Sequence, residues 1–171
     1  MSNEAQTKEL IDECQRQSES CNYTTINFTI WLRFLRGARF ICQVSPIIFG
    51  AIATWKVASQ SSPAIGAVCA LLATVIPPAY RASKLDTAIK DYATLAGEYA
   101  NLRDRFRQMA LIASHQEFKQ FEAQTKPYFE RLEKARRLTY TPPEWCFKLA
   151  QRKIQGGHYK HDYDEAKGEQ Q

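Results

Sequence analysis

Residues 40–58 read FICQVSPIIFGAIATWKVA, and residues 63–80 read PAIGAVCALLATVIPPAY. Thirteen residues of each run are apolar, and the only charged side chain between Phe40 and Tyr80 is that of Lys56. Because a helix rises about 1.5 Å per residue, each run extends roughly 27 Å, slightly less than the ~30 Å of membrane hydrocarbon. The two runs therefore predict a hairpin of two transmembrane helices, at about 40–58 and 63–80, joined by a short polar loop.

The rest of the chain is highly charged, so the chain is divided between two kinds of environment. Its mean hydropathy is −0.44 and 24% of its residues are charged, averages that alone would suggest a soluble protein. A segregation this sharp favours lipid around residues 40–80 and water around the rest. The alternative is a hairpin buried at the centre of a soluble helical bundle. Against it, neither run carries the polar stripe that a helix of a small soluble domain keeps toward water.

Basic residues stand at the two ends of the hairpin that are farthest from its loop. These residues are Arg33, Arg36, Arg39, Arg81, Lys84 and Lys90. The connecting loop, residues 59–62, has no charge. By the positive-inside rule we expect a multi-pass protein of the inner (plasma) membrane with both termini in the cytoplasm.

Small residues within the two runs are candidates for close helix packing around a pore. Gly66, Ala70 and Thr74 recur at four-residue spacing on the second run, and Gly50 and Thr54 offer a matching surface on the first. Small residues at this spacing let two helix backbones approach closely in a membrane. We therefore predict that these five residues form the contact inside the hairpin.

Polar residues and prolines also interrupt the apolar runs. Gln43 and Lys56 are costly in hydrocarbon unless they face protein or water. They are separated by a rotation of about 220° modulo a full turn, so they do not share one helix face. We expect Gln43 in a helix contact and Lys56 extended toward the outer interface. Pro46 predicts a kink in the first helix, and Pro77-Pro78 predicts an end or a bend in the second.

Helical patterns surround the hairpin and divide the chain into four parts. They are an N-terminal juxtamembrane helix (1–39), the two spans (40–80), a cytoplasmic helical region (81–157) and a polar tail (158–171). Within the third part, helix is expected over 118–138, interrupted by Pro127, and over 144–155, after the Thr141-Pro-Pro143 break. The predicted fold class is an all-α membrane protein whose N-terminal helix and long C-terminal helices form a cytoplasmic bundle.

The strongest periodic signal lies between Ser83 and Gln116, where apolar residues occupy the a and d positions of nearly five heptads. The candidate seam is made of Leu85, Tyr92, Leu95, Tyr99, Leu102, Phe106 and Met109. Two uses are open for these side chains: packing against the N-terminal helix of the same chain, and a seam between protomers of a homo-oligomer. We expect both.

Little in the sequence indicates catalysis, so we predict a protein that is not an enzyme and uses no cofactor or metal. His158, His161, Asp162 and Asp164 lie in the polar tail without a Cys or His partner at ligand spacing. Arg152 and His158 loosely match the Arg–His pattern of HEPN-type ribonucleases, but a Gly-Gly pair interrupts the helix that both would need. The net charge of +5 is modest and mixed with acids, which suits anionic lipid better than nucleic acid.

Several short stretches resemble a known family. They are YRASKLDTAIKDY at 80–92, LAGEY at 95–99, Leu102-Arg103 and Pro142-Pro-Glu-Trp145. With the layout of about residues 5–155, they resemble the SLATT family, the SMODS- and SLOG-associated two-transmembrane effectors. The resemblance implies an effector of bacterial antiphage conflict systems that oligomerises and perforates the inner membrane. Its trigger would be a separate sensor or a nucleotide second-messenger partner, and no catalytic residues are implied.

Two functions of different classes follow. The first is a homo-oligomeric membrane effector or pore, with other copies of the chain, membrane lipid and a nucleotide-signalling or sensor protein as partners. The alternative is a membrane-anchored structural or adaptor protein whose cytoplasmic coiled coil recruits partners. A conductance or leakage assay separates them.

Overall fold

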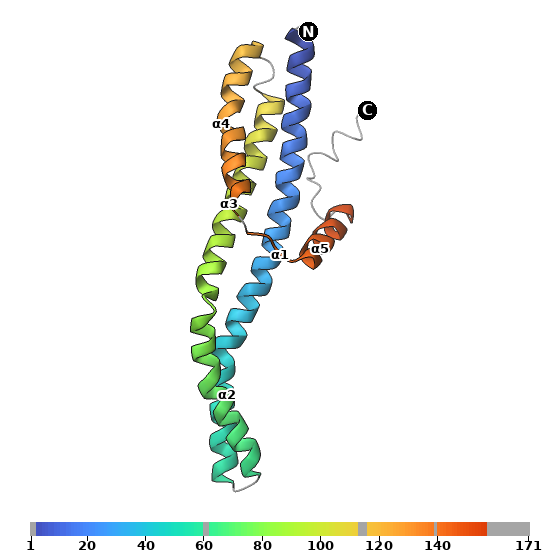
Figure 1. The fold of residues 1–171 in the computed structure, drawn as a ribbon. Coiled ribbons are helices and arrows are strands. Elements are labelled where there is room, and N and C mark those ends of the chain that lie inside the picture. Colours follow the sequence, from blue (N-terminus) through green and yellow to red (C-terminus); the bar gives the residue numbers. More distant parts are fainter. Residues whose placement is uncertain (1–2, 60–61, 113–115, 139, 157–171) are drawn as a thin grey trace. The chain divides into compact units, whose positions relative to one another are not determined.

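The computed structural model describes residues 3–59, 62–112, 116–138 and 140–156, and within these ranges it contains five α-helices and no strand (Figure 1). The helices are α1 (Asn3–Ala58), α2 (Pro63–Ala82), α3 (Leu85–Leu111), α4 (Phe118–Arg137) and α5 (Glu144–Gln155). The prediction of an all-helical chain with two long apolar helices is confirmed.

The prolines at 46, 77, 78 and 127 lie inside helices and do not end them. α1 runs through Pro46 for 56 residues, so the N-terminal helix and the first apolar run are one element. α2 continues through Pro77 and Pro78 to Ala82, which rules out a helix end at that pair, and α4 contains Pro127. Each proline removes one backbone donor, but the turns on either side keep their own hydrogen bonds and the helix persists. Thr141-Pro-Pro143, in contrast, does separate α4 from α5.

The chain forms two compact units, and α1 and α3 contribute to both. The bundle comprises the described residues of Met1–Trp31 and Tyr92–Gln171, and the hairpin unit comprises Leu32–Asp91. The bundle therefore takes the first half of α1, most of α3, and the whole of α4 and α5. The hairpin unit takes the second half of α1, α2 and the first turns of α3.

The bundle has a core of side chains that recur at helical spacing on four helices. Its buried members include Cys14, Cys21 and Phe28 of α1, Leu95, Tyr99, Leu102 and Phe106 of α3, Phe121, Thr125 and Leu132 of α4, and Cys146 and Ala150 of α5. Phe28 stacks on Tyr99 with ring centroids 5.8 Å apart, and Phe106 meets Phe129 edge-on at 5.0 Å. Aromatic pairs of this geometry add stabilisation beyond their buried area.

Polar contacts tie the bundle helices together around that core. The Ser18 hydroxyl donates to the Arg103 carbonyl oxygen at 3.1 Å, which links α1 to α3. Arg131 of α4 donates twice to the Glu98 carboxylate of α3, from Nε at 3.0 Å and from Nη2 at 2.9 Å. Both side chains are about a third or more exposed, so this pair contributes more to the register of the helices than to stability.

Candidate functional site

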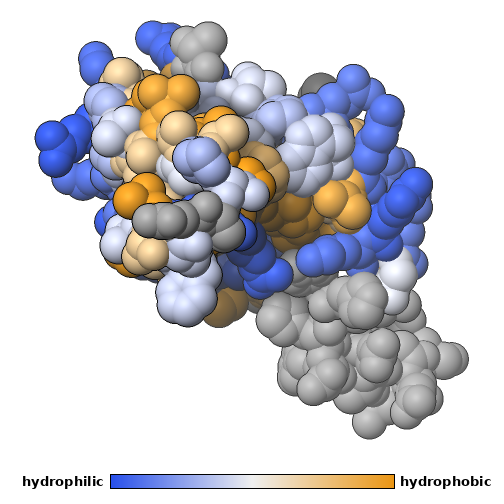
Figure 2. Space-filling model, turned by 90° about the horizontal axis from the view of Figure 1, so that it is seen from below, coloured by the Kyte–Doolittle hydropathy of each residue, from blue (hydrophilic) through white to orange (hydrophobic). Residues whose placement is uncertain are grey.

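The candidate functional site is the helical hairpin, because its apolar side chains are not buried by the chain itself. α1 and α2 are both long and apolar enough to cross a membrane, and only 6% of each apolar window is buried. Ile47 and Trp55 are 72% exposed, and Val57 is 69% exposed. Viewed end-on, apolar side chains coloured orange lie at the surface of the molecule (Figure 2). The hairpin is therefore not the core of the chain's own bundle, which was the alternative expected for a soluble protein.

Within the hairpin unit, Gly66 marks the close approach of α2 to α1. A Cβ added at Gly66 would lie 3.4 Å from Lys56 Cβ and 3.6 Å from the Ala53 carbonyl oxygen. Gly66, Cys69 and Ala53 are the buried residues of the two apolar runs. Gly66 thus occupies a helix contact, as its small size suggested.

The rest of the predicted small-residue ridge is not in this contact. Ala70, Thr74 and Thr54 are exposed, and a Cβ added at Gly50 would meet nothing within 4 Å. The buried and half-buried positions of α2 are 66, 69, 73, 76, 77 and 80, and all of them except 77 follow the alternating three- and four-residue spacing of left-handed helix pairs. The predicted ridge continued from Gly66 at a strict four-residue spacing, which follows a different row of the helix, so Ala70 and Thr74 lie outside the contact.

Gln43, Gly50 and Thr54 share one face of α1, a relation that our comparison of Gln43 with Lys56 missed. Gln43 and Thr54 are eleven residues apart, a rotation of about 20° modulo a full turn, and Gly50 lies about 20° from Gln43 in the other direction, so the three fall within about 40°. Gln43 and Thr54 are exposed and Gly50 is half-exposed. A comparison of all polar and small positions on a helical wheel would have found this face.

The two threonine hydroxyl groups of the apolar runs donate to carbonyl oxygens of their own helices. Thr54 donates to the Gly50 carbonyl oxygen at 2.9 Å, and Thr74 donates to the Leu71 carbonyl oxygen at 2.8 Å. This is the usual way in which a hydroxyl is accommodated in an apolar helix. Lys56 is half-buried, with its Cβ beside Gly66.

A polar cluster lies at the end of the hairpin opposite its loop. Asp86, in the first turn of α3, accepts a hydrogen bond from the Tyr80 hydroxyl at 2.6 Å and pairs with Arg39 Nε at 3.2 Å. Lys84, between α2 and α3, has a positive φ of 50°. Such a conformation is uncommon for a residue with a Cβ, and it marks the joint at which the chain leaves α2.

The side chains of the candidate seam on α3 pack mainly inside the bundle of the same chain. Leu95, Tyr99, Leu102, Phe106 and Met109 are at most 9% exposed, while Leu85 and Tyr92 are half-buried. The partners include Phe28 of α1 and Phe129 of α4. The heptad pattern thus identifies an intrachain core, and its use as a seam between protomers stays a prediction.

Three buried thiols lie in the bundle core. Cys14, Cys21 and Cys146 are at most 1% exposed, and all five cysteines are free. Burial raises the pKa of the Cys14 and Cys21 thiols from the usual 9.0 to about 11, and burial also raises the pKa of Cys146. These thiols therefore behave as small apolar core residues and poor nucleophiles.

No described part of the molecule offers a metal site. The residues that the structure describes contain no group of three His, Cys, Asp or Glu side chains suited to a metal. The histidines at 158 and 161 and the aspartates at 162 and 164 lie outside the described residues, as does the second member of the Arg152–His158 pair.

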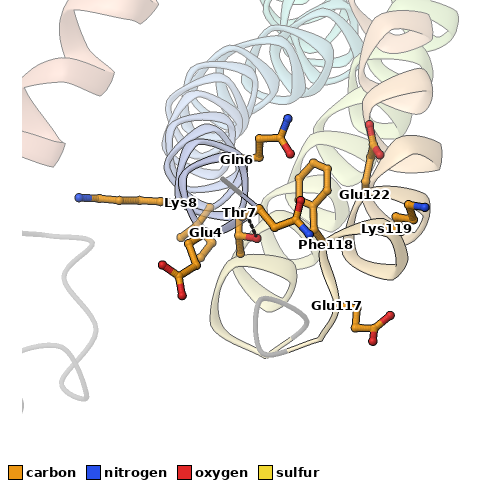
Figure 3. A pocket seen from close by; sticks show the side chains of 10 residues that line it. Glu4, Gln6, Thr7, Lys8, Glu117, Phe118, Lys119 and Glu122 are labelled. Carbon is orange, nitrogen blue, oxygen red and sulfur yellow. Dashed lines mark hydrogen bonds between the residues drawn. The ribbon is translucent and has the colours of Figure 1, made fainter. Parts of the chain in front are cut away.

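A depression of about 770 Å³ lies between the first turns of α1 and the start of α4. Its lining includes Thr7, Phe118 and Lys119, while Lys8 and Glu117 point outward from it (Figure 3). The mixed lining does not single out a ligand.

No protein-family model matches the chain, and no curated protein or solved structure matches it.

Proposed function

We propose that the chain is a two-span protein of the bacterial inner membrane, with both termini cytoplasmic, that assembles into homo-oligomers and perforates or depolarises the membrane in antiphage defence. The observation that carries the membrane part is the exposed apolar surface of α1 and α2. Contact with water would be unfavourable by about 25 cal/mol for each Å² of that surface. Lipid, or further copies of the hairpin, would remove this cost.

The basic residues support the orientation. Arg33, Arg36 and Arg39 are exposed on α1, as are Arg81 in the last turn of α2 and Lys84 just after that helix. Cations so placed suit the cytoplasmic interface of a hairpin whose loop lies outside. The bundle then lies in the cytoplasm, where its free thiols remain reduced.

Assembly in this proposal occurs through the hairpin rather than through α3. Two helices cannot enclose a lumen, so a pore requires several copies, most simply in a closed ring. The exposed face of α1 that carries Gln43, Gly50 and Thr54 supplies small and polar groups for helix contact or for lining a lumen. On α2, Ala70 and Thr74 are exposed and suit the same purpose.

The trigger in this proposal is a separate sensor or nucleotide-signalling protein that acts on the bundle. The basis is the resemblance of residues 80–92 and 142–145 to SLATT effectors. A family of such effectors carries no catalytic residues, so the chain would act by assembly alone.

One observation favours the alternative of an anchored adaptor. The α3 core side chains are satisfied within a single chain, so the bundle requires no second copy to bury them. A self-contained bundle on a membrane anchor is suited to recruiting another protein.

Reconstitution separates the two functions. Purified full-length protein is placed in dye-loaded vesicles at increasing protein density, and its oligomeric state is measured in the same vesicles. The effector proposal requires leakage that rises more steeply than in proportion to protein density. A protein that stays monomeric and never releases dye at high density refutes it and leaves the adaptor.

A further inference from the structure

We infer that the end of α4 and most of α5 form a second, peripheral membrane contact that binds anionic phospholipid headgroups. The residues concerned are 134–138 and 140–153, called here the basic segment. It contains six basic residues and one acidic residue, so it carries a net charge of +5, equal to that of the entire chain. The remaining residues together carry no net charge, so the net positive charge of the chain lies on this segment.

The basic segment also exposes large apolar side chains, although it belongs to the bundle and not to the hairpin. They are Leu138 (52% exposed), Tyr140 (38%), Trp145 (42%), Phe147 (48%) and Leu149 (39%). Exposed aromatic and aliphatic groups beside cations are the combination found in helices that lie in a membrane interface.

The orientation of α5 shows which face is available. Cys146 and Ala150 are fully buried, so this side of α5 faces the bundle core. Trp145, Leu149 and Arg152 fall within an arc of about 60° on a different side, and Lys148 lies next to them. All four are exposed. Trp145 also contacts Trp31 edge-on at 5.9 Å, which holds α5 against α1.

Intrachain pairs leave most of this positive charge uncompensated. Lys148 pairs with Glu144, the single acid of the basic segment, at 2.9 Å, and Arg137 pairs with Glu133 at 3.6 Å; all four side chains are about two-thirds or more exposed. Arg136 donates to the neutral Gln17 side chain at 2.8 Å. Exposed pairs of this kind contribute little, so the cations remain able to bind phosphate groups.

Lipid fits this surface better than nucleic acid does. Base stacking would use the aromatic rings, but it gives no role to exposed Leu138 and Leu149. Insertion into the headgroup region uses the leucines, the rings and the cations together. This inference goes beyond the proposed pore, because it concerns a surface outside the two spans.

Trp145 provides the probe once Trp31 and Trp55, the other two tryptophans of the chain, are replaced by Phe. The full-length protein is reconstituted into vesicles of brominated phosphatidylcholine, alone or mixed with phosphatidylglycerol. We expect Trp145 quenching and a blue shift in the mixed vesicles, both weakened by salt.

The decisive variant is Lys148→Gln/Arg152→Gln/Lys153→Gln. Each cation near an anionic surface contributes about 1 kcal/mol, about fivefold in binding, so the three changes should weaken the contact roughly a hundredfold. The matched control, Arg105→Gln/Lys119→Gln/Lys126→Gln, removes the same charge from exposed positions elsewhere on the bundle and should retain the quenching.

Three results overturn the inference. They are no quenching in the mixed vesicles, equal loss in both triple variants, and Trp145 quenching by a single-stranded oligonucleotide in place of lipid. Resistance of the same preparation to carbonate extraction reports separately whether the spans are inserted, so a failure of the basic segment is distinguishable from a failure of the two-span proposal.

Discussion

Replacing Leu102 by Ala should open the bundle, because Leu102 is fully buried at the centre of the α3 core. Truncating a buried leucine costs about 2–5 kcal/mol, the upper end applying where the cavity cannot collapse. Since about 1.4 kcal/mol is a factor of ten in an equilibrium constant, the population of the opened bundle should rise roughly 30-fold to several-thousand-fold.

The buried thiols supply the assay. In a Cys42→Ala/Cys69→Ala background the remaining cysteines, Cys14, Cys21 and Cys146, are all in the bundle core. Their reaction with an aromatic disulfide reagent, measured on the full chain in detergent, then reports bundle opening while the hairpin stays in its micelle. The Leu102→Ala variant should react faster by the factor given above.

Arg105→Ala is the matched control, because Arg105 lies three residues away on the exposed side of α3. Its hydrogen bond to Gln108 is exposed. Surface changes of this kind usually stay within about 0.5 kcal/mol, which is less than threefold in the thiol rate. Equal rates in the two variants, or an unchanged rate in Leu102→Ala, would show that the bundle core is not the one described.

Three further predictions concern the hairpin and the core thiols. In intact cells, an impermeant maleimide should label a cysteine placed at Ser61 of a Cys-free chain but not one at Ser2; labelling of both would refute the two-span topology. Gly66→Leu should abolish vesicle leakage, because the larger side chain overpacks the contact with Lys56. Gly37→Leu should retain leakage, because a Cβ added at Gly37 meets nothing within 4 Å. Equal leakage from the two variants would show that the Gly66 contact has no role in it. Burial raises the pKa of the Cys14 and Cys21 thiols from 9.0 to about 11, so between these pH values the folded bundle holds more protons than the unfolded chain. The free energy of unfolding, measured by denaturant titration, should therefore fall as pH rises from about 9 to about 11. An equally steep fall after both thiols are replaced by Ala would contradict this.

The helices and the core of the bundle could be predicted from the sequence, because they depend on local periodicity. Five of the predicted a and d positions of α3, Leu95, Tyr99, Leu102, Phe106 and Met109, are buried in the structure, and α5 occupies the predicted residues 144–155. The charge gap between Phe40 and Tyr80 likewise marked the apolar hairpin. In each case a single helix carries the information.

The residues that make the contact between α1 and α2 depend on how the two helices cross, and they could not be predicted from the sequence. Whether Gly66 meets Ala53 or Gly50 depends on the hand of the helix crossing, which small residues at a single spacing do not determine. The same holds for the α3 seam, because a heptad pattern does not tell a partner helix in the same chain from one in another copy.

The end of the hairpin opposite its loop is a candidate control point in the proposed effector. There α2 and α3 meet at Lys84, which has an uncommon backbone conformation with a φ of 50°. The Asp86 carboxylate restrains this joint within the hairpin unit, because it pairs with Arg39 at 3.2 Å and accepts a hydrogen bond from the Tyr80 hydroxyl at 2.6 Å. Asp86→Asn removes the charge of that pair and weakens the restraint on the helices of the hairpin. In the proposed effector it should then lower the protein density at which vesicles leak, and an unchanged leakage threshold would show that these contacts do not control the hairpin.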